Sequence, residues 1–464
     1  MLRPLHILPL QLGSALRLAA AFAAAAGILF STASAAAGAV SASRLRVSVP
    51  QAFSPELSGP EGTAFAARKK KGEEPEGARL DLAFGSAVAV QESLGGGKFR
   101  LLAATNGGPT CEGPALRAGN RTEPTRIYLL PDYSPAFVEL ALDLGAGTLT
   151  ATGTRRALKN GEDYVGIPPK TAGSLTLDYR ETPVSLTLQT VRPMRAPLSP
   201  LGISVSGNGS VWVADGTLPS LLRLSAKGLG EMQRVVPGKG LPRFLALGAL
   251  QLGFQGLAAL PDGRLATVLY PDARPEYAVI LVSRPSDWTS EAYVYPRPSG
   301  VRRFRLRGLA ASPKGVLFAV EEGEGKGGRR FSRLTRFTFR GADDMTMSPA
   351  AAGSFPDTTL SHLLAEGLRP IRPAVLADLG KLGITGTVSS LAVLDPRTIL
   401  AATDSAYGVR CTAGATASPA SLELSEKRKL FRNGKPLPDS EQMVRLRPSG
   451  ARTEAWVLRS PKPF

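Results

Sequence analysis

A recurring hairpin-like segment constrains the fold of this chain more than any other feature. It occurs at residues 202–215, 253–269, 308–321 and 390–404, and a weaker copy runs from Gly85 to Asn106. Each copy is a short apolar stretch, a turn rich in Pro, Asp or Gly, and a second apolar stretch. This order of residues is typical of a β-hairpin. The chain is therefore expected to be built from repeated antiparallel sheets.

The spacing of the copies indicates how these sheets are arranged. Gly202 and Gly256 are 54 residues apart, and Gly256 and Gly308 are 52 apart. The next interval, to Ser390, contains an insertion at about 340–370, and the 116 residues from Ser86 to Gly202 leave room for one unrecognised repeat. Periods near 50 residues are typical of propellers, whose sheets bury their faces against each other around a ring. We predict an all-β fold, a β-propeller of about six blades closed between its N- and C-terminal blades. Two β-sandwiches in tandem are the alternative.

The N-terminal residues predict export. Arg3 and Arg17 precede the apolar run Leu18–Phe30, which ends near the small residues Ala33-Ser34-Ala35. This order is that of a signal peptide, assigned to residues 1–35. The alternative is a membrane anchor, but a run of about 13 residues is shorter than the roughly 20 that span a bilayer. We expect a periplasmic or secreted protein without a transmembrane segment in its mature form. Residues 36–79, with their adjacent basic and acidic blocks, are assigned to a flexible linker, and residues 80–464 to the propeller.

The charge balance favours anionic partners. The full chain has 56 Lys and Arg against 38 Asp and Glu, a net charge of +18, and loses only two cations with residues 1–35. We expect an anionic small molecule or an envelope polymer as partner, and no nucleic acid, because the protein is expected to be exported. The alternative is that the basic composition serves only solubility.

Few of the common catalytic groups are present. The sequence has two histidines, His6 and His362, and neither Gly-x-Ser-x-Gly nor His-Glu-x-x-His nor Cys-x-x-Cys. These absences argue against a catalytic triad that uses histidine, against an α/β-hydrolase esterase and against the common zinc sites. We expect His362 to be an ordinary residue of a helix.

The two cysteines predict a disulfide. Cys111 follows the first hairpin, and Cys411 lies at the matching place after the last one. The first and last blades of a closed ring are neighbours, so the two residues would meet there, and disulfides are common in exported proteins. The alternative is two unpaired buried thiols.

Several segments resemble one bacterial exported family, described as esterase-like activity of phytase. The resemblance lies in Gly253–Gly263, in Val211–Asp215 with Pro219–Leu224, in Thr387–Gly408, and in Gly85–Ala87 with Asn106–Pro109. It implies a propeller that hydrolyses phosphate or related esters. Metal-assisted attack would suit such a site, because carboxylates from several blades can hold a hard cation such as calcium.

The chain departs from the family pattern at four positions. Gln255 and Ser389 stand where Glu is usual, Leu201 replaces an acid before Gly202, and Asn106 replaces an Asp. The acids that remain around the expected mouth, and that we assign to a calcium site, are Asp215, Glu321 and Asp404. The alternative is that these carboxylates only accept backbone hydrogen bonds from the turns that follow.

Two segments place arginine between apolar residues, 302–307 and 329–340. On a strand this gives one buried face and one arginine face, and guanidinium groups suit phosphate. We assign Arg302, Arg305, Arg333 and Arg336 to an anion-binding face, with charged sheet edges as the alternative. Two functions follow: a hydrolase of phosphate or related esters, or a catalytically inactive propeller that binds an anionic ligand or an envelope partner.

Overall fold

The protein is described by a computed structural model, which defines residues 40–57, 78–119, 121–169, 181–246, 253–270, 276–347, 358–413 and 417–464. Strands dominate these residues, so the all-β prediction is confirmed. Within them the one α-helix is α4 (Leu360–Ala365), and His362 is exposed on it.

No helix in the described ranges is long and apolar enough to cross a bilayer. The assigned signal peptide, residues 1–35, lies outside the described residues. Short 3-10 helices are η1 (Gln51–Phe53), η2 (Arg243–Ala246), η3 (Lys326–Gly328), η4 (Met345–Met347), η5 (Ala406–Gly408), η6 (Pro419–Ser421) and η7 (Asp439–Glu441).

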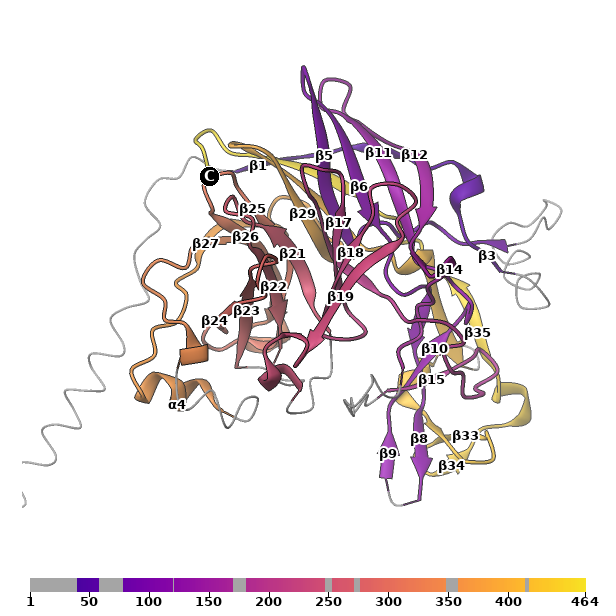
Figure 1. The fold of residues 1–464 in the computed structure, drawn as a ribbon. Coiled ribbons are helices and arrows are strands. Elements are labelled where there is room, and N and C mark those ends of the chain that lie inside the picture. The colour runs from indigo at the N-terminus through magenta and orange to yellow at the C-terminus, as the bar shows by residue number, and fades with distance from the viewer. Residues whose placement is uncertain are drawn as a thin grey trace, which may run out of the picture. The chain divides into compact units, whose positions relative to one another are not determined.

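Five antiparallel-based sheets of four or five strands form the larger part of the structure (Figure 1). The first has the order β2 (Arg46–Ser48), β12 (Thr148–Arg156), β11 (Ala136–Asp143), β6 (Lys98–Ala104), β5 (Ala87–Gly95). The second contains β16 (Pro200–Val205), β17 (Val211–Asp215), β18 (Ser220–Leu224), β19 (Glu231–Pro237) and β20 (Gly240–Leu241). The third contains β21 (Gln255–Ala259), β22 (Leu265–Leu269), β23 (Tyr277–Ser283) and β24 (Ser290–Pro296). The fourth contains β25 (Arg302–Ala311), β26 (Leu317–Glu324), β27 (Arg330–Phe337) and β28 (Ala374–Asp378). The fifth has the order β1 (Ser41–Arg44), β36 (Ala455–Arg459), β30 (Thr398–Thr403), β29 (Val388–Asp395).

The five sheets pack against one another in cyclic order. A separate hydrophobic cluster lies between each sheet and the next, and another lies between the fifth and the first. Neighbouring residues of one strand enter different clusters: Ala401 packs toward the fourth sheet, and Leu400 and Ala402 pack toward the first. Both faces of such a strand are buried, which explains why the second strands of the hairpins are continuous apolar runs.

The first strands of the sheets, β5, β16, β21, β25 and β29, contact one another in the same cyclic order. Glycine makes this close approach feasible. A Cβ on Gly202 would lie 2.3 Å from the backbone nitrogen of Leu257, and Gly256 has a φ of +73° that side chains disfavour. The recurring Gly of the hairpins is therefore a packing requirement at the centre of the structure.

The prediction of about six blades is not confirmed, because five sheets of the described residues pack in this cyclic order. The difference arises between Ser86 and Gly202, where we allowed one additional repeat. That stretch contributes to only one of the five sheets packed in this order before β16, since β6 and β11 are neighbours in it although a long insertion separates them in sequence. The inserted residues fold elsewhere.

These insertions form a second set of small sheets, which we call the accessory lobe. It has its own core, with Ile127, Val184, Val409 and Leu446 among its buried residues. A further short pair, β13 (Leu158–Lys159) with β14 (Glu162–Asp163), follows the first sheet. The lobe consists of β3 (Glu56–Leu57), β4 (Ala78–Arg79), β7 (Thr110–Glu112), β8 (Ala115–Ala118), β9 (Arg121–Glu123), β10 (Thr125–Tyr128), β15 (Thr182–Val184), β31 (Val409–Ala413), β32 (Glu423–Leu424), β33 (Leu430–Arg432), β34 (Lys435–Pro436) and β35 (Val444–Pro448).

The linker assigned to residues 36–79 is wrong for its first part. Strand β1 pairs with β36 of the fifth sheet, and β2 pairs with β12 of the first, so both belong to the packed sheets. Figure 1 shows the indigo β1 running beside the yellow C-terminal part of the chain. The sequence of β1, Ser-Ala-Ser-Arg, is small and polar because the strand is an exposed edge, so it carries no apolar signal. Residues 58–77, which include the charge blocks, lie outside the described residues.

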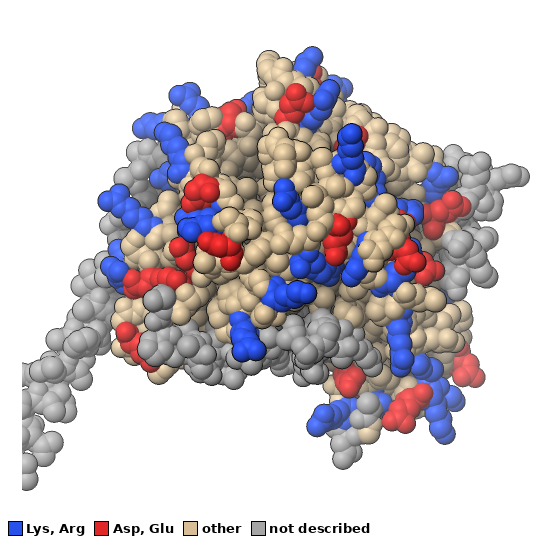
Figure 2. All heavy atoms as spheres, viewed as in Figure 1, with Lys and Arg blue, Asp and Glu red and all other residues tan. Residues whose placement is uncertain are grey.

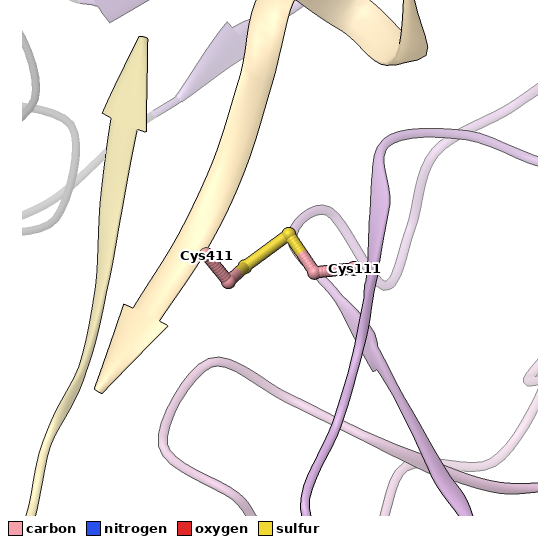
Figure 3. Close-up of a disulfide and its surroundings, with 2 residues drawn as sticks. All are labelled: Cys111 and Cys411. Carbon is pink, nitrogen blue, oxygen red and sulfur yellow. A yellow bond between two sulfur atoms is a disulfide. The ribbon is translucent and has the colours of Figure 1, made fainter. Parts of the chain in front are cut away.

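The predicted disulfide is confirmed. Cys111 of β7 and Cys411 of β31 are bonded, with Cα atoms 5.9 Å apart, across a sequence separation of 300 residues (Figure 3). The bond joins the insertion of the first sheet to the insertion of the fifth, within the accessory lobe.

Candidate functional site

A narrow cavity of about 20 Å³, lined by both polar and apolar groups, lies where the first strands of the five sheets meet, and we call it the mouth. It takes lining residues from every sheet, and its only charged members are Arg307 and Asp404. Leu201, Gln255, Arg307 and Ser389 share one position, since each directly precedes the recurring Gly or Ser of its hairpin. The complete lining is Ser86, Leu201, Gln255, Gly256, Arg307, Gly308, Ser389 and Asp404.

Asp404 follows β30 and is partly exposed in the mouth. Its Oδ2 accepts a hydrogen bond from Asn106 Nδ2 at 3.2 Å, and its Oδ1 accepts one from the Ala406 backbone N–H at 2.9 Å. Burial raises the pKa of Asp404, and the Ala406 N–H, the Arg307 guanidinium and Asn106 oppose that rise. A carboxyl group of this kind holds its proton to a higher pH than a surface aspartate.

The backbone beyond Asp404 is strained. Ala406 and Tyr407 have φ values of +46° and +60°, a region that side chains seldom adopt. The Tyr407 ring is buried in the core of the accessory lobe and meets the Tyr133 ring edge-on, with centroids 5.6 Å apart. Such strain persists only where the surroundings enforce it and is common at functional sites. The lobe thus fixes the turn that presents Asp404.

Arg307 supplies the positive charge of the mouth. Its Nε lies 3.1 Å from Glu322 Oε2, and the charge of the guanidinium also acts on Asp404. From the sequence, Arg307 was not assigned to a site, although it occupies the same position before Gly308 that Gln255 occupies before Gly256. Aligning the hairpins on that position would have found it.

Ser86 has an unsatisfied hydroxyl. The residue is 2% exposed, and its Oγ has no hydrogen-bond partner within the described part of the chain. Ser390, at the corresponding place in the fifth sheet, instead donates to the Gly85 carbonyl at 2.9 Å. A buried polar atom without a partner costs stability, so the Ser86 hydroxyl is a candidate contact for a ligand in the mouth.

Asp215, one of the three assigned metal ligands, does not line the mouth. It is fully buried at the end of β17, and its Oδ1 accepts hydrogen bonds from Ser199 N at 3.0 Å, Thr217 N at 2.9 Å and Thr217 Oγ1 at 2.7 Å. Its Oδ2 lies 3.5 Å from Arg234. Every direction around this carboxylate is occupied by a donor, which is the arrangement of a structural aspartate.

Glu321, the second assigned ligand, lies on β26 and is 2% exposed. Its Oε1 accepts the Tyr295 hydroxyl at 2.6 Å, and it pairs across the sheet with Arg333. Burial raises the pKa of Glu321 against the opposing effects of Tyr295 and Arg333. Asp404 is therefore the one assigned acid that reaches the mouth.

These placements do not fit calcium. Across the described ranges, no three side chains of His, Cys, Asp or Glu gather as a metal site would require. Each of the three assigned carboxylates also has an arginine acting on it, Arg234, Arg333 and Arg307 respectively. Oxygen ligands of calcium need their lone pairs free of such cations.

Calcium is consequently expected to leave the melting temperature unchanged. An ion that binds only the folded state would stabilise it by about 2.7 kcal/mol at a hundredfold excess over Kd. Differential scanning fluorimetry with calcium and with a chelator checks this. A clear calcium-dependent rise would restore the metal site implied by the family resemblance.

A larger cavity of about 840 Å³, which we call the basic cleft, is lined by residues of the fourth sheet and of the segment that leads into β29. Of the four assigned anion-binding residues, Arg305 and Arg333 line it, whereas Arg302 and Arg336 are exposed on β25 and β27 outside it. Figure 2 shows Lys and Arg side chains gathered at the upper left of the view, over the region where Figure 1 labels β25 and β27.

Comparison with solved structures finds only distant likenesses. Hydrazine synthase of Kuenenia stuttgartiensis is 9% identical, with 82% of this chain and 99% of that chain covered and a TM-score of 0.33. Virginiamycin B lyase from Staphylococcus aureus is 9% identical, with 77% and 99% covered and a TM-score of 0.27. The PQQ-bound aldose sugar dehydrogenase from Streptomyces coelicolor is 12% identical, with 80% and 98% covered and a TM-score of 0.26. Scores of this size carry no argument about activity.

No curated protein matches the sequence. The model of one protein family does match, over residues 118–405, which is more than half of the chain. That stretch contains β16 to β30 and seven of the eight residues that line the mouth, all except Ser86. The resemblance noted in the sequence is thereby confirmed, and the chain belongs to the phytase-like family described as esterase-like activity of phytase.

Proposed function

We propose that the five sheets are the blades of a β-propeller, and that the protein is an exported hydrolase of phosphate or related esters acting at the mouth. One observation carries this proposal: a guanidinium group, a carboxyl group with a raised pKa and an unsatisfied hydroxyl converge in one cavity. Perturbed titratable groups in a cleft are typical of catalytic sites. Membership of the family supports the same reaction class.

The groups of the mouth have separate roles in this reaction. Arg307 neutralises the anionic oxygens of the ester, and the Ser86 hydroxyl donates to one of them. Protonated Asp404 gives its proton to the leaving oxygen while water attacks the phosphorus. The bond from phosphorus to the alcohol oxygen breaks, a bond to the water oxygen forms, and phosphate and an alcohol leave. The attacking water loses one proton to solvent, and the Asp404 carboxylate takes one proton back from solvent. Asn106 holds the Asp404 carboxyl through its hydrogen bond to Oδ2.

Export is supported by two features. The apolar run before Ala33-Ser34-Ala35 has the order of a signal peptide, and the Cys111–Cys411 bond is of a kind that persists in oxidising compartments. We place the protein in the periplasm or outside the cell.

The decisive experiment is the substitution Asp404→Asn, assayed with para-nitrophenyl phosphate and with a carboxyl ester. Loss of a general acid lowers kcat by about 10²- to 10⁴-fold. Asp395→Asn is the matched control, because Asp395 lies at the other end of the same hairpin, where it accepts the Arg397 N–H at 2.7 Å. Wild-type protein without turnover on any such ester, or Asp404→Asn with full activity, would overturn the proposal.

The pH profile gives a second test. A general acid works only while protonated, so kcat is expected to fall as the pH rises through the raised pKa of Asp404. The charged or titratable groups that act on Asp404 or lie near it are Arg307, Tyr133 and Tyr407, and both tyrosines have pKa values raised mainly by burial. The falling limb should be absent in Asp404→Asn. A limb that persists in this variant would assign the titration to another group.

Binding of anions without turnover is the second candidate function. It is favoured by the neutral residues Leu201, Gln255 and Ser389, which make the mouth a site for anions. Turnover by the wild-type protein distinguishes the two functions.

A further inference from the structure

We propose that the basic cleft binds an extended chain of phosphate groups, such as linear polyphosphate. The reaction at the mouth rests on the function proposed above. The binding in the cleft does not, and it can be measured separately.

The cleft is strongly basic. Its walls are β25, the hairpin between β26 and β27, and the segment from Asp378 to Thr387 that leads into β29. Its volume of about 840 Å³ lies in the range of cavities that hold molecules far larger than one phosphate ion. Seven cationic side chains face three acidic ones there: Arg303, Arg305, Lys326, Arg329, Arg330, Arg333 and Lys381 against Glu322, Glu324 and Asp378.

The ion pairs within the cleft leave much of this positive charge unpaired. Arg303 and Arg330 both approach Glu324, at 3.1 Å and 3.9 Å. Glu322 is occupied by Arg307, which lies outside the cleft. Lys326, Arg329 and Lys381 form no ion pair with any residue that the structure describes. Three cations that share one cavity and are not paired with its carboxylates favour a ligand that carries several negative charges.

A hydroxyl group adds a donor to the cleft. Ser332 Oγ is buried, and no hydrogen-bond partner exists for it among the described residues. Arg333, beside it, lies over the Phe331 ring with its guanidinium carbon 4.4 Å from the ring centroid. This stacking fixes the arginine plane and leaves its N–H groups directed along the plane, which suits the oxygens of phosphate.

Two segments of the chain contribute residues to both the cleft and the mouth. Arg305 lines the cleft and Arg307 lines the mouth, and these alternate residues of β25 are about 7 Å apart on one face. On the facing side, Thr387 lines the cleft, and its carbonyl accepts the backbone N–H of Asp404 at 3.1 Å. The two cavities therefore draw on neighbouring residues of β25.

Inorganic polyphosphate of defined chain length, compared with orthophosphate by isothermal titration calorimetry, tests the proposal. We expect affinity to rise with chain length and to exceed that for orthophosphate by at least about tenfold, with strong weakening by salt. The triple variant Lys326→Gln, Arg329→Gln, Lys381→Gln should lose roughly tenfold or more of this affinity. The matched control is Arg302→Gln with Arg336→Gln, which removes charge from the same sheet outside the cleft and should change little.

The other possible outcomes show whether the cleft proposal or the proposed hydrolase function fails. Equal affinity for orthophosphate and polyphosphate, or equal losses in the control and the triple variant, would overturn the cleft proposal. Polygalacturonate bound as tightly as polyphosphate would overturn the choice of phosphate over carboxylate. Asp404→Asn should still bind polyphosphate, and the control variant, Arg302→Gln with Arg336→Gln, should still hydrolyse para-nitrophenyl phosphate. Chain-length-dependent binding in a protein without any turnover would reject the hydrolase and retain the cleft.

Discussion

Replacing Cys111 and Cys411 together by Ser is expected to lower the free energy of unfolding by about 5 kcal/mol. The bond spans 300 residues, and a crosslink across so long a loop strongly restricts the unfolded chain. For a protein of this size that loss corresponds to a fall in melting temperature of roughly 6 °C. Calorimetry of the double variant measures it.

Reduction of the wild-type protein with dithiothreitol is the companion experiment, since it breaks the same bond without changing a side chain. Both treatments should give the same destabilisation. The mouth should respond as well, because Asn106 and Asp404 lie a few residues before the two cysteines and meet across the same gap between insertions. An unchanged melting temperature in both cases would show that packing of the accessory lobe alone holds the two insertions together.

Asp215→Ala is expected to destabilise the protein by about 3–5 kcal/mol. The substitution removes a buried charge partner of Arg234 and leaves the N–H groups of Ser199 and Thr217 without an acceptor. Urea denaturation measures the loss. Asp215→Asn keeps the shape and one acceptor oxygen, so a smaller loss is expected and the folded variant remains measurable.

The control for this prediction is Asp262→Ala. Asp262 forms a closer ion pair, at 2.7 Å from Arg264, but its side chain is 52% exposed. Exposed pairs contribute about 0–1 kcal/mol, so this variant should be nearly as stable as the wild type. Similar losses in the two variants would contradict the structural role assigned to Asp215.

The contrast between Asp215 and Asp404 shows how far the sequence could predict the site. Both acids lie at the end of the second strand of a hairpin, and on that pattern both were assigned to one metal site. Register separates them: Asp215 pairs with Pro200 inside the second sheet, whereas Asp404 lies one residue beyond the last paired position of β30. One residue along a strand reverses the direction of a side chain, and a hydrophobicity pattern does not resolve a shift of that size.

Strand β1 and the accessory lobe could not be predicted from the sequence for another reason. Hairpins with buried faces can be recognised in a sequence by their apolar runs and turn residues. Strand β1 has no such run, because it is an exposed edge strand held by backbone hydrogen bonds to β36. The lobe is assembled from insertions that are distant in sequence, so no local period marks it.

By itself the sequence determined the strand-rich fold, the family and the pairing of the two cysteines, because these depend on local periodicity and on the order of repeats. The tertiary structure alone decided the number of sheets, the burial of Asp215 and Glu321, and the meeting of Arg307, Ser86 and Asp404. Those properties depend on register and on contacts between remote segments, and the free energy of such contacts is not encoded in any short stretch of the chain.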